Sequence, residues 1–184
     1  PGAGYESHRH SDVEIVTWVL AGALAHEDST GARGVLRPGE VQHVSARAGV
    51  EHTERNASTT EPLHFLQMML APSDAELTDP HLGPPAYRHW DLQGARGYLL
   101  DVLWVRDGVM LHAALLDTGD LVDLPEDGLV HLQVTRGRVE VAGETLERGD
   151  VLRATGEGPL RVKGVAPSEI LAWHLRPGTD PGAA

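Results

Sequence analysis

The sequence predicts an all-β protein built from two similar barrels in tandem, and three observations support this. Apolar residues alternate with a period of two far more often than with the period of a helix. Turn signals rich in Gly and Pro recur at roughly the 8–12-residue spacing typical of barrels and sandwiches. The second half also repeats the first, because residues 134–139 resemble 19–24 and residues 147–151 resemble 37–41.

The predicted strands of the first half follow one another with short turns between them. Ala21-Gly22 and Pro38-Gly39 are typical turn pairs, since Gly and Pro interrupt regular structure. The strands are expected at residues 13–20, 23–28, 34–37, 40–46, 50–56 and 62–71. They predict an N-terminal barrel over residues 1–71.

This rhythm stops at residues 72–94, where prolines lie among acidic and polar residues. Such a composition predicts a linker between domains. Alternation resumes near Gly97 and predicts a C-terminal barrel over residues 95–176. The last segment, 177–184, is expected to be a frayed tail.

Composition disfavours several classes of function. The chain has 184 residues and a net charge of −12, which argues against direct binding to nucleic acid. It has no Cys, which excludes disulfides, thiolate metal sites and iron–sulfur clusters. No stretch approaches the roughly 20 apolar residues of a membrane span, and no secretory pattern opens the chain, so a cytoplasmic location without membrane contact is expected. Motifs of serine hydrolases, zinc proteases and nucleotide-binding proteins are missing as well.

Two pairs of metal-ligating residues have the spacing of a strand. His8 and His10 are two residues apart, and so are His52 and Glu54. Residues two apart in a strand point to the same face, so adjacent strands would bring both pairs together. Three imidazoles and one carboxylate suit a divalent transition metal such as Fe, Mn, Co, Ni, Cu or Zn. On an octahedral ion they would leave two positions for water, O2 or a substrate oxygen.

Other polar residues of the first half are candidates for the surroundings of this site. The alternation of residues 40–46 suggests that His43 points into the barrel, near the metal or a substrate. Gln67 interrupts an apolar face that includes Phe65, so both are expected to line a pocket. His26, just before a glycine turn, is expected to form hydrogen bonds within that corner.

The order of these motifs resembles a known family. Residues 8–22 approximate the first cupin motif, H-x-H followed by Glu and Gly, and residues 49–56 match the core of the second, G-x-x-H-x-x-x-N. More specifically, the chain is similar to the pirin family of the cupin superfamily. The matching pieces are HRHSDVEIVTWVLAGALAHEDSTG, RPGEVQ, AGVEHTE and EPLHFLQ.

The resemblance implies a bicupin, two tandem cupin-type β-barrels of which only the N-terminal one binds metal. The implied ligands are His8, His10, His52 and Glu54. Glu14 is at the position of a ligand in many other cupins and is a second candidate for the carboxylate, although a structural role is expected here. Family members also have a strand upstream of the H-x-H motif, so the N-terminal barrel of this chain is expected to lack its first strand.

The resemblance further implies a metal-dependent dioxygenase similar to the quercetin 2,3-dioxygenases of this family. Fe(II) would be the expected metal, and a flavonol or similar small aromatic enol would react with O2 while Glu54 accepts its proton. The alternative is a metal- or redox-sensitive regulator that binds a partner protein without turnover. A different cupin reaction on another enol or keto acid is the third hypothesis.

Overall fold

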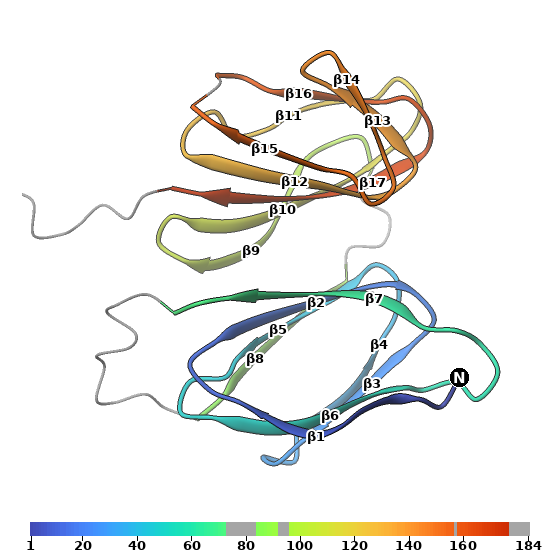
Figure 1. The fold of residues 1–184 in the computed structure, drawn as a ribbon, viewed down its shortest axis with the longest axis vertical. Helices are drawn as coiled ribbons and strands as arrows, with labels where there is room; N and C mark the ends of the chain where they lie inside the picture. The colour runs from blue at the N-terminus through green and yellow to red at the C-terminus, as the bar shows by residue number, and fades with distance from the viewer. Residues whose placement is uncertain (73–83, 92–95, 157, 177–184) are drawn as a thin grey trace, which may run out of the picture. The chain divides into compact units, whose positions relative to one another are not determined.

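The computed structural model describes residues 1–72, 84–91, 96–156 and 158–176, and all regular structure in these residues is β (Figure 1). Among them, no helix is long and apolar enough to cross a membrane. The chain divides into two compact units, Pro1–Gln93 and Gly94–Ala184. The predicted fold class, two β-units in tandem, is confirmed.

The N-terminal unit contains two antiparallel four-stranded sheets. One has the order β1 (Gly4–His10), β6 (Val50–Asn56), β3 (Leu24–Asp28), β4 (Arg33–Leu36). The other has the order β7 (His64–Leu70), β2 (Glu14–Ala21), β5 (Glu40–Ser45), β8 (Ala86–Asp91). The two sheets form separate layers in Figure 1.

Apolar side chains of both sheets meet in two buried clusters. The residues concerned are Ile15, Val44, Ala46 and Val50 in one cluster and Val19, Leu24 and Leu36 in the other. Val50 therefore marks the inner face of β6. Because side chains alternate along a strand, His52 and Glu54 face the same interior.

The expected linker at residues 72–94 is corrected by strand β8. Residues Ala86–Asp91 pair with β5 along its whole length, from Glu40 opposite Asp91 to Ser45 opposite Ala86. They belong to the N-terminal unit, since ladder hydrogen bonds satisfy their backbone there in spite of the neighbouring prolines. The rest of the expected linker, at 73–83 and 92–94, and the expected tail at 177–184 lie outside the described residues.

The C-terminal unit repeats the strand order of the first. The described residues of this unit form the strands β9 (Leu100–Arg106), β10 (Val109–Leu116), β11 (Leu121–Asp123), β12 (Leu129–Arg136), β13 (Arg138–Val141), β14 (Glu144–Glu147), β15 (Val151–Thr155), β16 (Arg161–Gly164) and β17 (Ser168–Leu175). The order β15-β12-β17 matches β5-β2-β7, and β11-β16-β13-β14 matches β1-β6-β3-β4. Strand β17 also pairs with β10, which pairs with β9. Among the described residues the N-terminal unit has no counterpart of this last pair.

A glycine in each unit shows that the sequence repeat is a structural one. Gly22 has φ 81° and Gly137 has φ 72°, and both follow the second strand of the repeated order. A Cβ on Gly22 would collide with the carbonyl oxygen of Pro62, and one on Gly137 with that of Pro167. Each position therefore requires glycine for two reasons, the positive φ angle and the close approach of a backbone carbonyl.

We expect Gly22→Ala to destabilise the N-terminal unit more than Gly31→Ala. Gly31 has φ 88°, but a Cβ there meets nothing within 4 Å. The control therefore suffers only backbone strain of roughly 1–2 kcal/mol, whereas Gly22→Ala adds a clash with backbone. Urea unfolding of both variants measures the difference. Equal losses of unfolding free energy would show that the clash relaxes without cost.

Candidate metal centre

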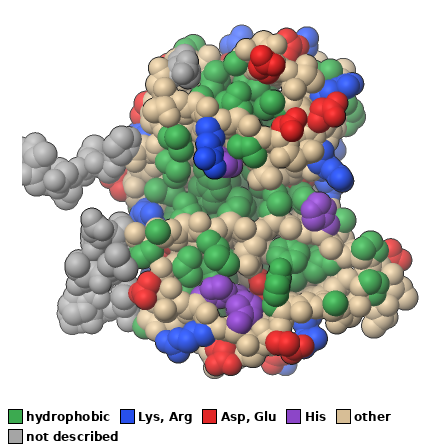
Figure 2. All heavy atoms as spheres, in the orientation of Figure 1, with side chains coloured by type: hydrophobic (Ala, Val, Ile, Leu, Met, Phe, Trp, Pro, Cys, Tyr) green, Lys and Arg blue, Asp and Glu red, His purple; other side chains and the backbone are tan. Residues whose placement is uncertain are grey.

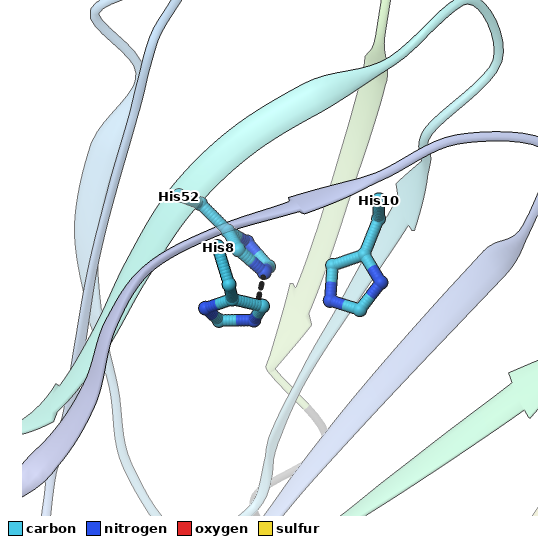
Figure 3. A group of neighbouring side chains, drawn as sticks. All are labelled: His8, His10 and His52. Atoms are coloured by element: carbon cyan, nitrogen blue, oxygen red, sulfur yellow. Dashed lines mark hydrogen bonds between the residues drawn. The ribbon is translucent and has the colours of Figure 1, made fainter.

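Three histidines converge inside the N-terminal unit (Figure 3). His8 and His10 extend from β1, and the register places His8 directly opposite His52 on β6. The Nε2 atoms of His8 and His52 are 3.0 Å apart, and the ring of His10 is centred 5.0 Å from that of His52. His8 and His10 are half-buried, while His52 is buried, and histidine side chains of this unit reach the surface next to apolar ones in Figure 2.

The arrangement fits a transition-metal ion. Each of the three imidazoles offers one nitrogen, and these atoms lie within 4.8 Å of one another. Two nitrogens bound at right angles about 2.1 Å from an ion are themselves about 3.0 Å apart, which is the separation between His8 and His52. Nε2 of His10 is buried without a hydrogen-bond partner among the described residues. Such an atom is costly to leave unsatisfied, and a cation would satisfy it.

Glu54 adds a buried carboxylate next to this cluster. Its side chain is 1% exposed, and both of its oxygens accept hydrogen bonds from Nε2 of Gln67, at 3.0 and 2.8 Å. Glu54 forms a second group of ligand atoms within 4.8 Å together with His26 and His52. The two predicted pairs, His8 with His10 and His52 with Glu54, thus lie on neighbouring strands, and His52 belongs to both groups of ligand atoms. Gln67 orients the carboxylate.

Burial and mutual repulsion control the charges of these groups. Burial first, and then the neighbouring His26, His8 and His10, lower the pKa of His52 to about 4. Burial also lowers the pKa of His10 and raises that of Glu54. Neutral imidazole is the form that binds metal, so His52 is ready to do so over a wide pH range.

The metal-free protein is expected to lose stability between about pH 6.5 and pH 4. In this window the unfolded chain binds protons at His10, His26 and His52, whose pKa values are lowered in the folded state, and the excess of bound protons favours unfolding. The raised pKa of Glu54 acts in the opposite sense, through a single group. Thermal unfolding of metal-free protein should show a Tm at pH 5 lower than at pH 7 by on the order of 5 °C. In His52→Ala the drop should be smaller, and an unchanged drop would contradict the role of His52.

Glu14 and His43 lie on the opposite face of their sheet and not with the histidine cluster. Nε2 of His43 is 2.5 Å from Oε2 of Glu14, and Ser45 Oγ donates to Oε1 of Glu14 at 2.7 Å. Their neighbours Ile15 and Val44 face the core with Val50, so strand alternation turns Glu14 and His43 the other way. The expectation that His43 points into the barrel is therefore wrong, and Glu14 is not placed to serve as the alternative carboxylate.

The sequence reasoning missed His26. It is 2% exposed, and neither ring nitrogen has a hydrogen-bond partner among the described residues, so the expected bonds within its corner do not form. Asp28 fills that role, because its Oδ1 accepts from Thr30 and from the backbone of Ala32. His26 faces inward opposite Glu54, which only the pairing of β3 with β6 reveals.

The remaining candidates have simpler environments. Phe65 packs, partly buried, against the apolar cluster of Val19, Leu24 and Leu36. In the described part of the C-terminal unit, no three His, Asp or Glu side chains come as close together as the two groups of the N-terminal unit. The prediction that this unit holds no metal stays a prediction.

Family models and curated relatives with substantial identity to this chain indicate one family. The model of the family "Pirin" matches residues 2–70, and that of the "Quercetinase C-terminal cupin domain" matches residues 100–175. A protein of Mycobacterium tuberculosis is 35% identical over 189 residues, covering 95% of this chain and 75% of the relative. The quercetin 2,3-dioxygenase of Escherichia coli K12 is 30% identical over 186 residues, covering 96% and 78%.

Solved structures agree with these matches. The crystal structure of YhhW from Escherichia coli has a TM-score of 0.82 and 29% identity, covering 96% of this chain and 77% of that one. The nickel(II) complex of the same bacterial pirin has a TM-score of 0.80 and 28% identity, covering 95% and 77%. With two family models, the identities and the duplicated fold in agreement, this chain belongs to the pirin family of bicupins.

Proposed function

We propose that the protein is a metal-dependent dioxygenase that cleaves a flavonol or a similar small aromatic enol with O2. The observation that carries the proposal is the cluster of His8, His10 and His52, with Glu54 beside it, in a chain related to a quercetin 2,3-dioxygenase. A cation in the cluster would satisfy the unpaired buried nitrogen of His10, and the relationship suggests the type of reaction. Fe(II) remains our preferred metal, and the other divalent transition metals of the sequence prediction remain alternatives.

His8, His10, His52 and Glu54 are the residues that would hold the ion. When bound, the metal would act as a Lewis acid that lowers the pKa of a substrate hydroxyl. It would also offer open coordination positions to O2. The three imidazoles contribute no charge while they are neutral, so Glu54 is the one anionic group of the proposed ligand set. Its raised pKa makes it a stronger base than an exposed carboxylate.

Gln67 and Glu54 form the proton-accepting part of the proposed site. Gln67 donates to both oxygens of Glu54 and thereby fixes the direction of the carboxylate. A fixed, buried carboxylate can accept the hydroxyl proton of an enol without reorganising water around itself. The bound substrate would then be present as the more electron-rich enolate, which is the form that reacts with O2.

The test is oxygen consumption with simultaneous detection of carbon monoxide, using Fe(II)-loaded protein and quercetin. Release of carbon monoxide in proportion to oxygen consumed supports the proposal. If protein shown to contain stoichiometric metal gives no turnover with quercetin, flavonol cleavage is not its reaction. The remaining hypotheses, a regulator that binds a protein partner or a cupin enzyme with another enol, would then be pursued.

A further inference from the structure

A cavity of about 270 Å³ lies in the N-terminal unit, between the strand pair β3–β4 and the strand pair β5–β8. Its walls include His26, Gly34, Leu36, Gln42, Tyr87 and His89. His26 is shared between this cavity and the group that it forms with His52 and Glu54. The cavity therefore reaches the candidate metal centre through one side chain, from β3 and not from β1, which carries His8 and His10.

Gly34 leaves the wall beside His26 open. It is the residue of β4 that pairs with His26, and a Cβ on it would meet nothing within 4 Å. A second hollow of about 320 Å³, lined by Arg33, Thr53 and Arg55, also includes His26 and Gly34 in its wall. Space thus exists next to His26 although that side chain is 2% exposed.

Two polar groups in the cavity wall lack partners. Both ring nitrogens of His26 and the amide oxygen of Gln42 are buried without a hydrogen bond among the described residues. An unpaired buried polar atom costs roughly 1–3 kcal/mol. The oxygen of Gln42 accepts only, whereas a neutral imidazole donates with one nitrogen and accepts with the other. A hydroxyl group matches both requirements, since it donates and accepts.

The rest of the wall combines apolar side chains such as Leu36 and Val35 with the polar side chains of Arg33 and His89 at its edge. Leu36 is 2% exposed and belongs to the core of the unit. The hydroxyl of Tyr87 is already used, because it donates to Asp28, and the ring of Tyr87 contacts that of His26, with 5.8 Å between their centroids. Asp28 is in turn held by Thr30 and Ala32. A cavity of this size, slightly below the usual range for drug-sized ligands, is suited to a compact aromatic molecule.

We propose that this cavity binds a hydroxylated aromatic molecule whose hydroxyl groups form hydrogen bonds with His26 and Gln42. The inference rests on the proposed function and deepens it, since it assigns the binding residues of the aromatic substrate. Substrate would approach the metal centre from the β4–β8 side. His26 would contact both the substrate and the residues that hold the metal.

The experiment is a titration of metal-free protein with quercetin, followed by tryptophan fluorescence and equilibrium dialysis. Gln42→Leu removes the amide oxygen, and Gly34→Val fills open space on an exposed strand position, so neither removes a core contact. Each variant is expected to raise Kd at least tenfold. Gln133→Leu, on β12 of the C-terminal unit, is the matched control and should bind as the parent does.

His8→Ala separates this proposal from the proposed function. It removes a candidate metal ligand that does not line the cavity, so metal-free His8→Ala should bind quercetin as tightly as the parent protein. Parent-like Kd values for Gln42→Leu and Gly34→Val, in variants whose thermal unfolding is cooperative, would overturn the cavity proposal. The proposal would also be overturned if the control Gln133→Leu raised Kd as much as the two cavity variants do. A chain that binds quercetin in the cavity but releases no carbon monoxide when metal-loaded would disprove only the dioxygenase activity.

Discussion

Replacement of His52 by alanine is expected to abolish metal binding and, with it, oxygenase turnover. His52 belongs to both groups of candidate ligands, and its ring contacts those of His8, His10 and His26. Loss of an outer-shell partner alone costs about 10–100-fold in metal affinity, so loss of a direct ligand should cost more than about 100-fold. Metal per chain, measured by mass spectrometry after dialysis, should fall from about one to below about a tenth.

His112→Ala is the matched control for this experiment. His112 is also a buried histidine with an unpaired Nε2 among the described residues, but it lies on β10 and pairs with Asp101. It should retain the metal and the turnover of the parent protein. A His52→Ala protein that still holds stoichiometric metal after dialysis would refute the assignment of the centre.

Glu54→Gln is expected to lower turnover at least 100-fold, with a smaller loss of bound metal. The amide keeps the size of the side chain and can still accept a hydrogen bond from Gln67, but it cannot take up a proton. General base catalysis usually contributes about 10²–10⁴-fold. Steady-state oxygen consumption at saturating quercetin, normalised to the measured metal content, separates the chemical defect from metal loss.

Glu14→Gln tests the carboxylate that the sequence offered as the alternative to Glu54. Glu14 is 8% exposed and is bound to His43 and Ser45 on the far face of its sheet. The replacement should lower the free energy of unfolding, because the amide forms weaker hydrogen bonds with His43 and Ser45 than the carboxylate does. Turnover per metal ion should stay within about twofold of the parent protein. A large loss of turnover in Glu14→Gln with little in Glu54→Gln would exchange the roles of the two residues.

Strand alternation explains why the sequence located the histidine centre but misplaced its neighbours. The rule that residues two apart in a strand share a face was enough to predict that His8 lies beside His10 and that His52 lies beside Glu54. To place His43, one must know which face of β5 packs against the core, the face that carries Val44 or the face that carries His43. The buried cluster of Ile15, Val44 and Val50 decides this, and it forms from three different strands. No local pattern carries that information.

The linker shows the same limit in another form. Prolines around residues 72–94 predict an interruption, and proline does disfavour strand interiors. Strand β8 nevertheless forms at Ala86–Asp91 because β5 offers it a complete edge for backbone hydrogen bonds. Pairing between strands far apart in the chain outweighed the local preference.

The sequence alone determined the all-β class and the duplication and predicted the two pairs of candidate metal ligands, since period-two patterning, turn glycines and i, i+2 spacing are local properties. Only the tertiary structure decided that His8 stands opposite His52, that Gln67 holds Glu54, and that His26 and Gln42 lack partners beside one cavity. These relations depend on strand register and on which face packs inward. Both are set by hydrophobic burial across the whole unit, where a shift by one residue would turn every side chain of a strand to its other face.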